Sequence, residues 1–133
     1  MKPAQALAIA CLLSIPTAAG AQDALPPADV AIFSVFHARL VAAGELGTWA
    51  STRLDNGKAR GTARKVAGHA KDGWEYVTKF LAKHGASVQP VADDSLALAA
   101  GMLQTRLESL QGRALDSAWS HHMTIWLDHA RGQ

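Results

Sequence analysis

The chain has 133 residues, enough for one domain, and it is 49% hydrophobic but only 6% aromatic. This composition is typical of a globular protein and excludes a disordered or low-complexity chain. The formal net charge of +2 excludes a polybasic nucleic-acid-binding protein, so no nucleic acid is expected as a partner. The single cysteine, Cys11, excludes an intramolecular disulfide framework and a cysteine-based zinc site.

Residues 1–21 have the features of a secretory signal peptide. A lysine at the second position precedes an apolar run at 4–15, and residues 19–21 (Ala-Gly-Ala) form a cleavage site of small residues. The run is shorter than the roughly 20 apolar residues of a membrane-spanning helix. Cleavage after Ala21 of the 133 residues leaves 112, without cysteine. We therefore predict an exported protein of a bacterial periplasm.

Cys11 leaves one alternative open for the N-terminus. The residues before it loosely resemble a lipoprotein cleavage site, but Ala8 stands where such a site has leucine, and the apolar run continues past the cysteine. A soluble mature chain is therefore favoured over a lipid-anchored one. Arg39 and Glu45 interrupt the only later apolar stretch of comparable length, so no membrane-spanning helix is expected there.

After a predicted extended lead-in at 22–28, whose two prolines cannot lie in a helix interior, four segments show helical periodicity. The first helix is expected from the cap Asp29 to about residue 55, before the turn pair Asn56-Gly57. Its apolar residues recur every three or four positions and predict one buried stripe at Ile32, Phe36, Leu40, Ala43, Gly47, Ala50 and Leu54.

The second helix is expected at about 58–84 with Gly85 as its C-terminal cap, the third begins after a capping Asp93 or Asp94, and the fourth covers about 113–131. Their predicted stripes are Ala63, Val66, Ala70, Trp74, Val77 and Leu81; then Leu96, Ala99, Leu103, Leu107 and Leu110; then Leu115, Ala118, Trp119, His122, Ile125, Trp126 and His129. Long helices with short connections predict an all-α fold, an antiparallel four-helix bundle over residues 29–131.

Four pieces of the sequence follow one another in a characteristic order. They are AAGELG at 42–47, His69 in the middle of the second helix, LAKHG at 81–85 and GRALDSAW at 112–119. Together they resemble the bacterial domain-of-unknown-function family 4142, and the resemblance implies an exported, ferritin-like bundle. It also implies a further helix after the fourth. This sequence stops at Gln133, before such a helix. The burial of its five or so large apolar side chains would contribute about 2 kcal/mol each. Without that helix one apolar face of the bundle would be uncovered, so we expect self-association.

Six histidines, all in the predicted mature chain, are the candidate metal ligands. A ferritin-like di-metal centre needs Glu-x-x-His pairs, which place a carboxylate and an imidazole on one helix face. No acidic residue stands three positions before any histidine, and Ala43 and Gly68 stand where the family resemblance implies acidic residues. Ferroxidase-type chemistry is therefore not expected, and no catalytic residue is assigned.

A single-ion site is the alternative. His122 and His129 share the stripe of the fourth helix but lie about 10 Å apart along its axis, too far to share one ion without ligands from other helices. His69 and Glu45 are candidates for those ligands. We favour structural roles for all four residues, with Glu45 solvated or paired with Arg53, over a site for a transition metal ion.

The remaining charges have structural explanations. Arg39 falls within an apolar stripe and is expected to reach the end of the bundle or to pair with an acid such as Asp116. Four cations at 58–65 are expected to be solvated, with an anionic lipid of the envelope as the alternative partner.

The leading hypothesis is an exported, non-enzymatic bundle protein of the bacterial cell envelope that acts by binding or assembly without a cofactor. The alternative is a small periplasmic metal-binding or redox protein that uses interior histidines.

Overall fold

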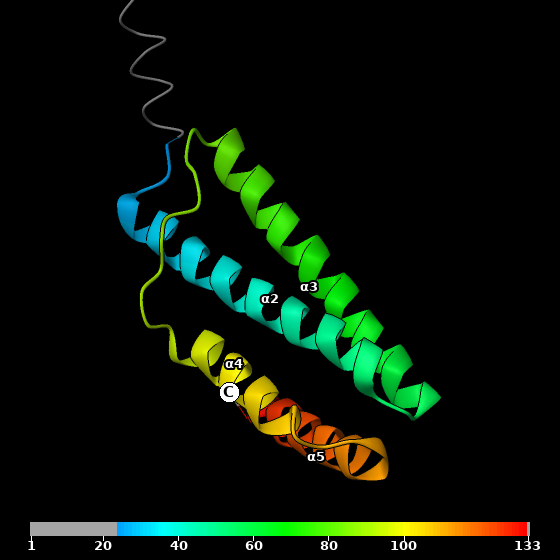
Figure 1. The fold of residues 1–133 in the computed structure, drawn as a ribbon. Helices are drawn as coiled ribbons and strands as arrows, with labels where there is room; N and C mark the ends of the chain where they lie inside the picture. The colour runs from blue at the N-terminus through cyan, green and yellow to red at the C-terminus, as the bar shows by residue number, and fades with distance from the viewer. Residues whose placement is uncertain (1–23, 133) are drawn as a thin grey trace, which may run out of the picture.

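The computed structural model describes residues 24–132, apart from the side chains of residues 126, 127 and 129–131. These residues form four α-helices and no β-strand: α2 (Pro27–Arg53), α3 (Gly57–Lys83), α4 (Ser95–Leu107) and α5 (Gly112–Arg131). The all-α prediction is therefore confirmed for the described part of the chain (Figure 1). The predicted signal peptide, residues 1–21, lies outside that part, so it stays a prediction.

α2 begins two residues before the predicted start at Asp29. Pro26 is its N-cap, with φ −55° and ψ 145°, and Pro27 is the first helical residue. Proline suits this position because its φ is already helical and the first N–H groups of a helix have no intrahelical partner. The two prolines therefore mark a helix start, and Asp29 lies in the first turn, where a negative charge is favourable.

Asp94 and Gly85 were predicted at helix ends and are confirmed there, and Asn56, predicted as a turn residue, is in addition the cap of α3. The Asn56 side chain accepts a hydrogen bond from the Ala59 N–H at 3.0 Å at the start of α3. The Asp94 side chain accepts one from the Ala97 N–H, also at 3.0 Å, at the start of α4. Gly85 follows α3 with φ +70°, a left-handed conformation that glycine adopts without strain. Each of these boundaries is set by residues close to the helix end.

α2 and α3 form a long antiparallel hairpin joined by a short turn (Figure 1). Small residues let the two helices approach closely. A Cβ on Gly47 would stand 3.0 Å from the backbone oxygen of Ala63 and 3.0 Å from the backbone nitrogen of Ala67. A Cβ on Gly44 would meet the Trp74 ring at 2.5 Å. The AAGELG segment is therefore the surface on which α2 packs against α3.

The hydrophobic core lies at the turn end of this hairpin, where α4 packs along the second half of α2 and α5 turns back beside it (Figure 1). All four helices contribute to it, together with the residue that follows α2: Leu46, Ala50, Leu54, Ala63, Ala100, Leu103, Leu107, Leu115 and Trp119. Most of these residues belong to the predicted stripes, whereas Leu46 and Ala100 are buried beside them and were not predicted.

At the opposite end of the hairpin the predicted stripe of α3 is confirmed by the buried Val77 and Leu81, but the predicted stripe of α2 is wrong. Ile32 and Phe36 of α2 are 66% and 52% exposed, and Leu96 of α4 and Ile125 of α5 are exposed as well. α2 has 27 residues and α4 has 13. At 1.5 Å per residue, α4 therefore extends over only about half the length of α2. The first turns of α2 consequently carry apolar side chains that the described part of α4 does not reach.

α2 is long and apolar enough to cross a membrane, judged by length and composition alone. We expected Arg39 and Glu45 to exclude this, and on composition that expectation is wrong. Core helices of soluble proteins and signal sequences meet the same criterion. In the structure α2 packs against α3 and α4, which are the contacts of a helix in a bundle.

Candidate functional site

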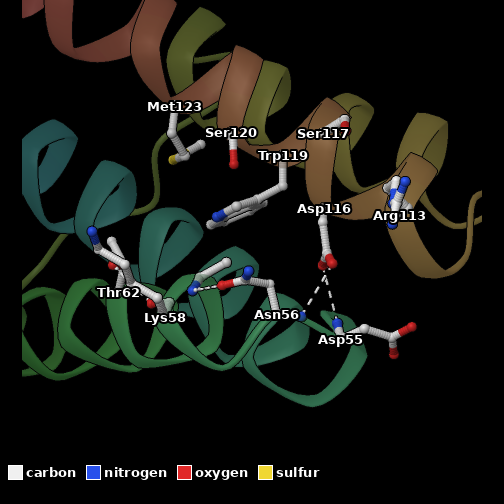
Figure 2. Close-up of a pocket in the computed structure, with 11 residues that line it drawn as sticks. Asp55, Asn56, Lys58, Thr62, Arg113, Asp116, Ser117, Trp119, Ser120 and Met123 are labelled. Carbon is white, nitrogen blue, oxygen red and sulfur yellow. Dashed lines mark hydrogen bonds between the residues drawn. The ribbon is translucent and has the colours of Figure 1, made fainter.

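A groove of about 840 Å³ lies between the start of α3 and the first turns of α5 (Figure 2). The turn between α2 and α3 and the first turns of α3 form one wall, and α5 forms the other. Its lining residues are Asp55, Asn56, Lys58, Ala59 and Thr62 on the first wall, and Arg113, Asp116, Ser117, Trp119, Ser120 and Met123 on the second. Small-molecule sites have volumes on the order of 300–1,000 Å³, so the groove is the first candidate site.

Asp116 connects the two walls of the groove. Its Oδ1 accepts a hydrogen bond from the Asp55 N–H at 3.0 Å, and its Oδ2 accepts one from the Asn56 N–H at 3.1 Å (Figure 2). The expected pairing of Arg39 with Asp116 is therefore wrong, because this carboxylate binds the turn between α2 and α3. Asp116 thereby attaches α5 to that turn and closes one end of the groove.

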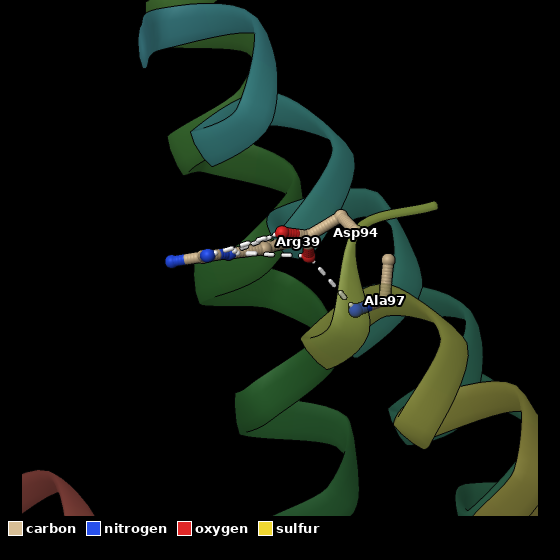
Figure 3. A network of polar contacts seen from close by, with 3 residues as sticks. All are labelled: Arg39, Asp94 and Ala97. Atoms are coloured by element: carbon tan, nitrogen blue, oxygen red, sulfur yellow. Dashed lines mark hydrogen bonds and ion pairs between the residues drawn. The ribbon is translucent and has the colours of Figure 1, made fainter. Parts of the chain in front are cut away.

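Arg39 pairs instead with Asp94, the N-cap of α4 (Figure 3). Its Nε donates to Asp94 Oδ1 at 3.2 Å and to Oδ2 at 3.1 Å, and one terminal nitrogen donates to Oδ1 at 3.0 Å. Arg39 pairs with Asp94 because α4 starts beside the middle of α2, where Arg39 lies. One carboxylate thus serves two elements, since Asp94 also caps its own helix through Ala97.

This pair shifts the ionisation of both groups. The hydrogen bond from Arg39 lowers the pKa of Asp94, and the Ala97 N–H lowers it further. The same hydrogen bond raises the pKa of Arg39. Both shifts favour the charged forms, so Asp94 stays a carboxylate across the neutral range and holds α4 against α2.

The predicted metal ligands lie on three different helices. Glu45 is exposed on α2, His69 is exposed on α3, and His122 is half-buried on α5 with its ring 5.7 Å from that of His121. The side chain of His129 lies outside the described residues. Among the residues that the structure describes, no three His, Cys, Asp or Glu side chains are grouped as metal ligands are. The transition-metal site therefore stays a prediction, without an arrangement that supports it.

Other predicted charges are on the surface. Glu45 makes no ion pair with Arg53, because the ion pairs within residues 24–132 are Arg39–Asp94 and Lys71–Glu75. The four cations at 58–65 are all exposed. At 100° per residue their spacing distributes them around α3, so they do not form one charged face.

A second candidate surface lies at the end of the hairpin away from its turn. We call it the open-end patch, and it comprises Ile32, Phe33 and Phe36 of α2 and Tyr76 and Phe80 of α3. The Phe33 and Phe80 rings are 5.0 Å apart across the two helices, and the Tyr76 and Phe80 rings stack at 6.3 Å. Tyr76 is 66% exposed. The patch therefore combines a ring cluster that joins the two helices with three apolar side chains that are more than half exposed, Ile32, Phe36 and Tyr76.

The sequence did not reveal the groove. The stripe of the fourth helix predicts Trp119 in the core, which is confirmed because Trp119 is 2% exposed, and Lys58 belongs to the basic segment at 58–65. No spacing relates these residues, because they approach only through the packing of α5 on α3. The position of Asp116 near the start of a helix predicts a favourable charge there, but it does not identify the turn at 55–56 that Asp116 binds.

Comparison of the chain with protein-family models, with curated proteins and with solved structures gives no match. The resemblance to family 4142 therefore rests on the sequence pieces that carry it. The geometry of the groove and of the open-end patch is the remaining basis for a function.

Proposed function

We propose that this chain is an exported helical protein of the bacterial cell envelope that acts by binding or assembly and not by catalysis. Four helices that share one core support this role, as does the resemblance to a family of exported proteins. In this proposal the helices form an antiparallel, ferritin-like bundle, and a second copy of the chain covers the part that α4 and α5 leave open. For the alternative, a metal-binding or redox protein, the described residues offer no favouring observation.

The open-end patch is the observation that carries the proposal. Single exposed apolar residues are common on monomeric proteins and need no explanation. Here Ile32, Phe36 and Tyr76 are each more than half exposed, and the contact between Phe33 and Phe80 joins the two helices that carry them. The same patch on a second copy is self-complementary in a two-fold dimer, which is the commonest symmetric assembly.

The cost of removing one of these side chains follows from its exposure. Full burial of a phenylalanine contributes about 1.5–3 kcal/mol, and Phe36 is 52% exposed in the single chain. Its burial in a dimer therefore contributes about 1 kcal/mol per copy. A two-fold interface contains the residue twice, so the loss is about 2 kcal/mol, or about thirtyfold in the dissociation constant.

Sedimentation equilibrium over a range of protein concentrations tests this assembly. We expect a concentration-dependent dimer for the wild-type protein and at least a tenfold weaker one for Phe36→Gln. The matched control is Met102→Gln on α4, since Met102 is 58% exposed but lies outside the patch, and its dimer should be unchanged. A cooperatively folded protein that stays monomeric at all concentrations would remove the proposal.

Export is tested separately by the mass of the protein recovered from the periplasm of an expressing bacterium. We expect the 112-residue chain that begins at Gln22. Recovery of the full 133-residue chain from the cytoplasm alone would contradict the predicted signal peptide. Co-sedimentation with anionic vesicles, compared between the wild type and the double charge reversal Arg60→Glu and Arg64→Glu, tests the alternative of a lipid partner.

A further inference from the structure

We propose that the outer face of α3 binds the surface of a lipid bilayer that contains anionic headgroups. α3 packs against α2, and α4 and α5 lie on the other side of α2 in Figure 1. One side of α3 therefore faces away from the rest of the molecule along most of the roughly 40 Å of the helix. The inference rests on the proposed function in one respect, which is that a protein of the cell envelope meets membrane surfaces.

α3 concentrates the positive charge of the chain. Seven of its 27 residues are lysine or arginine and two are acidic, so its formal charge is +5. The whole chain has a formal charge of +2, so all the other residues together carry −3. An uneven distribution of this kind attracts a protein to a surface of opposite charge and orients it there.

The cations of α3 form two rows along its outer face. Residues four, seven or fourteen positions apart lie nearly above one another on an α-helix, at about 100° per residue. One row is Arg60, Arg64 and Lys71, and the other, about a third of a turn away, is Lys58, Lys65, Lys79 and Lys83. The buried residues of α3 lie on the far side of the helix from both rows. The cations at 58–65 are thus divided between two rows that the full length of the helix completes.

The charged ends of these side chains are available to a partner. All seven cations are exposed, and within residues 24–132 only Lys71 is in an ion pair, with Glu75 at 3.9 Å. Gly61 and Gly68 lie between the rows, and a Cβ on either would meet no atom within 4 Å. The long lysine and arginine side chains therefore extend beyond the middle of the face and reach a flat surface first.

The length of the face favours a planar array of anions. The rows extend from position 58 to position 83, about 38 Å along the helix axis. A small anion would meet two or three of these cations, whereas the headgroups of a bilayer meet both rows at once. A second copy of the chain offers no matching face, because the acidic residues of 24–132 outside α3 are divided among α2, α5 and the three connections between helices.

Co-sedimentation of the purified protein with vesicles of equimolar phosphatidylglycerol and phosphatidylcholine, and with vesicles of phosphatidylcholine alone, tests the proposal. We expect stronger binding to the anionic vesicles, reduced at least tenfold between about 0.05 M and about 0.5 M salt, because salt screens exposed charges. The double variant Arg60→Gln and Arg64→Gln should bind about thirtyfold more weakly, since each basic residue near an anionic bilayer contributes about fivefold. Lys65→Gln with Lys79→Gln, from the other row, should show the same loss.

The matched control is the double variant Arg53→Gln and Arg106→Gln. It removes two positive charges from exposed positions of α2 and α4, and Arg53 lies beside the connection between α4 and α5. We expect this variant to bind less than threefold more weakly than the wild type. All variants keep the wild-type N-terminus, so residues 1–21 cannot produce a difference between them.

Three results would each overturn the assignment. These are equal binding to the two kinds of vesicle or binding to neither, an equal loss in the α3 variants and the control, or binding to immobilised heparin but not to vesicles, which would indicate a soluble polyanion. Circular dichroism of each variant ensures that a loss reflects the charge and not the fold, and every substituted residue is exposed. Self-association is measured without lipid, so the failure of either proposal leaves the other standing.

Discussion

Gly47→Ala tests how closely α2 and α3 approach each other. The added Cβ would lie 3.0 Å from the Ala63 backbone oxygen, 3.0 Å from the Ala67 backbone nitrogen and 3.3 Å from the Ala67 Cβ. Two of these atoms belong to the backbone of α3 and cannot rotate away as a side chain can. The substitution must therefore move the two helices apart at the point where α2 meets the backbone of α3.

Gly68→Ala is the matched control on α3. A Cβ there meets no other atom within 4 Å, and the residue is exposed. Replacing a glycine by alanine in a helix interior gains about 1 kcal/mol of helix propensity at both positions. Overpacking at Gly47 costs about 1–3 kcal/mol in addition. We therefore expect Gly68→Ala to stabilise the protein and Gly47→Ala to be less stable than Gly68→Ala by about 1–3 kcal/mol.

Urea denaturation followed by circular dichroism measures this difference, with unchanged m-values showing that the two variants unfold by the same transition. For a domain of about 100 residues the difference corresponds to roughly 4–12 °C in Tm. If Gly47→Ala is as stable as Gly68→Ala, the helices are farther apart than the structure places them. Gly44→Ala should lower the free energy of unfolding by less than the 2.5 Å approach suggests, because the Trp74 ring at that contact belongs to a side chain that can shift.

Three further predictions concern the polar contacts and the metal question. Asp116→Ala should lower the free energy of unfolding by about 1–2 kcal/mol, because it removes the acceptor of two N–H groups, whereas Asp55→Ala should change it by less than about 0.5 kcal/mol in the same urea titration. Since Arg39 lowers the pKa of Asp94 in the folded state, the stabilisation is complete above the pKa of the unfolded carboxyl, about 4, and is lost as the pH falls through the folded-state pKa. Acid titration of stability should show that loss in the wild type and a flatter profile in Arg39→Gln; identical profiles would contradict the pairing. Elemental analysis of natively purified protein should find less than one metal ion per chain, and stoichiometric metal that disappears in His122→Ala would establish the alternative function.

The charged and apolar residues of α2 illustrate what the sequence leaves open. The helix is apolar around most of its circumference, so its periodicity does not select one buried face. The stripe that includes Gly47 and Ala50 is buried at the turn end. Phe36 of the same stripe is exposed because α4 packs along only the second half of α2. For Arg39 the sequence suggested Asp116 as a partner, whereas the position of α4 places Asp94 beside it.

The sequence by itself determined that the fold of residues 24–132 is all-helical and located most helix ends within a few residues, because signals such as the cap Asp94 and the glycine at position 85 act locally and need no distant partner. Only the tertiary structure decided which faces are covered, where α5 closes a groove against α3, and which side chains are left for a partner. These properties depend on the relative lengths and positions of helices that are far apart in the chain, and local periodicity contains no information about them.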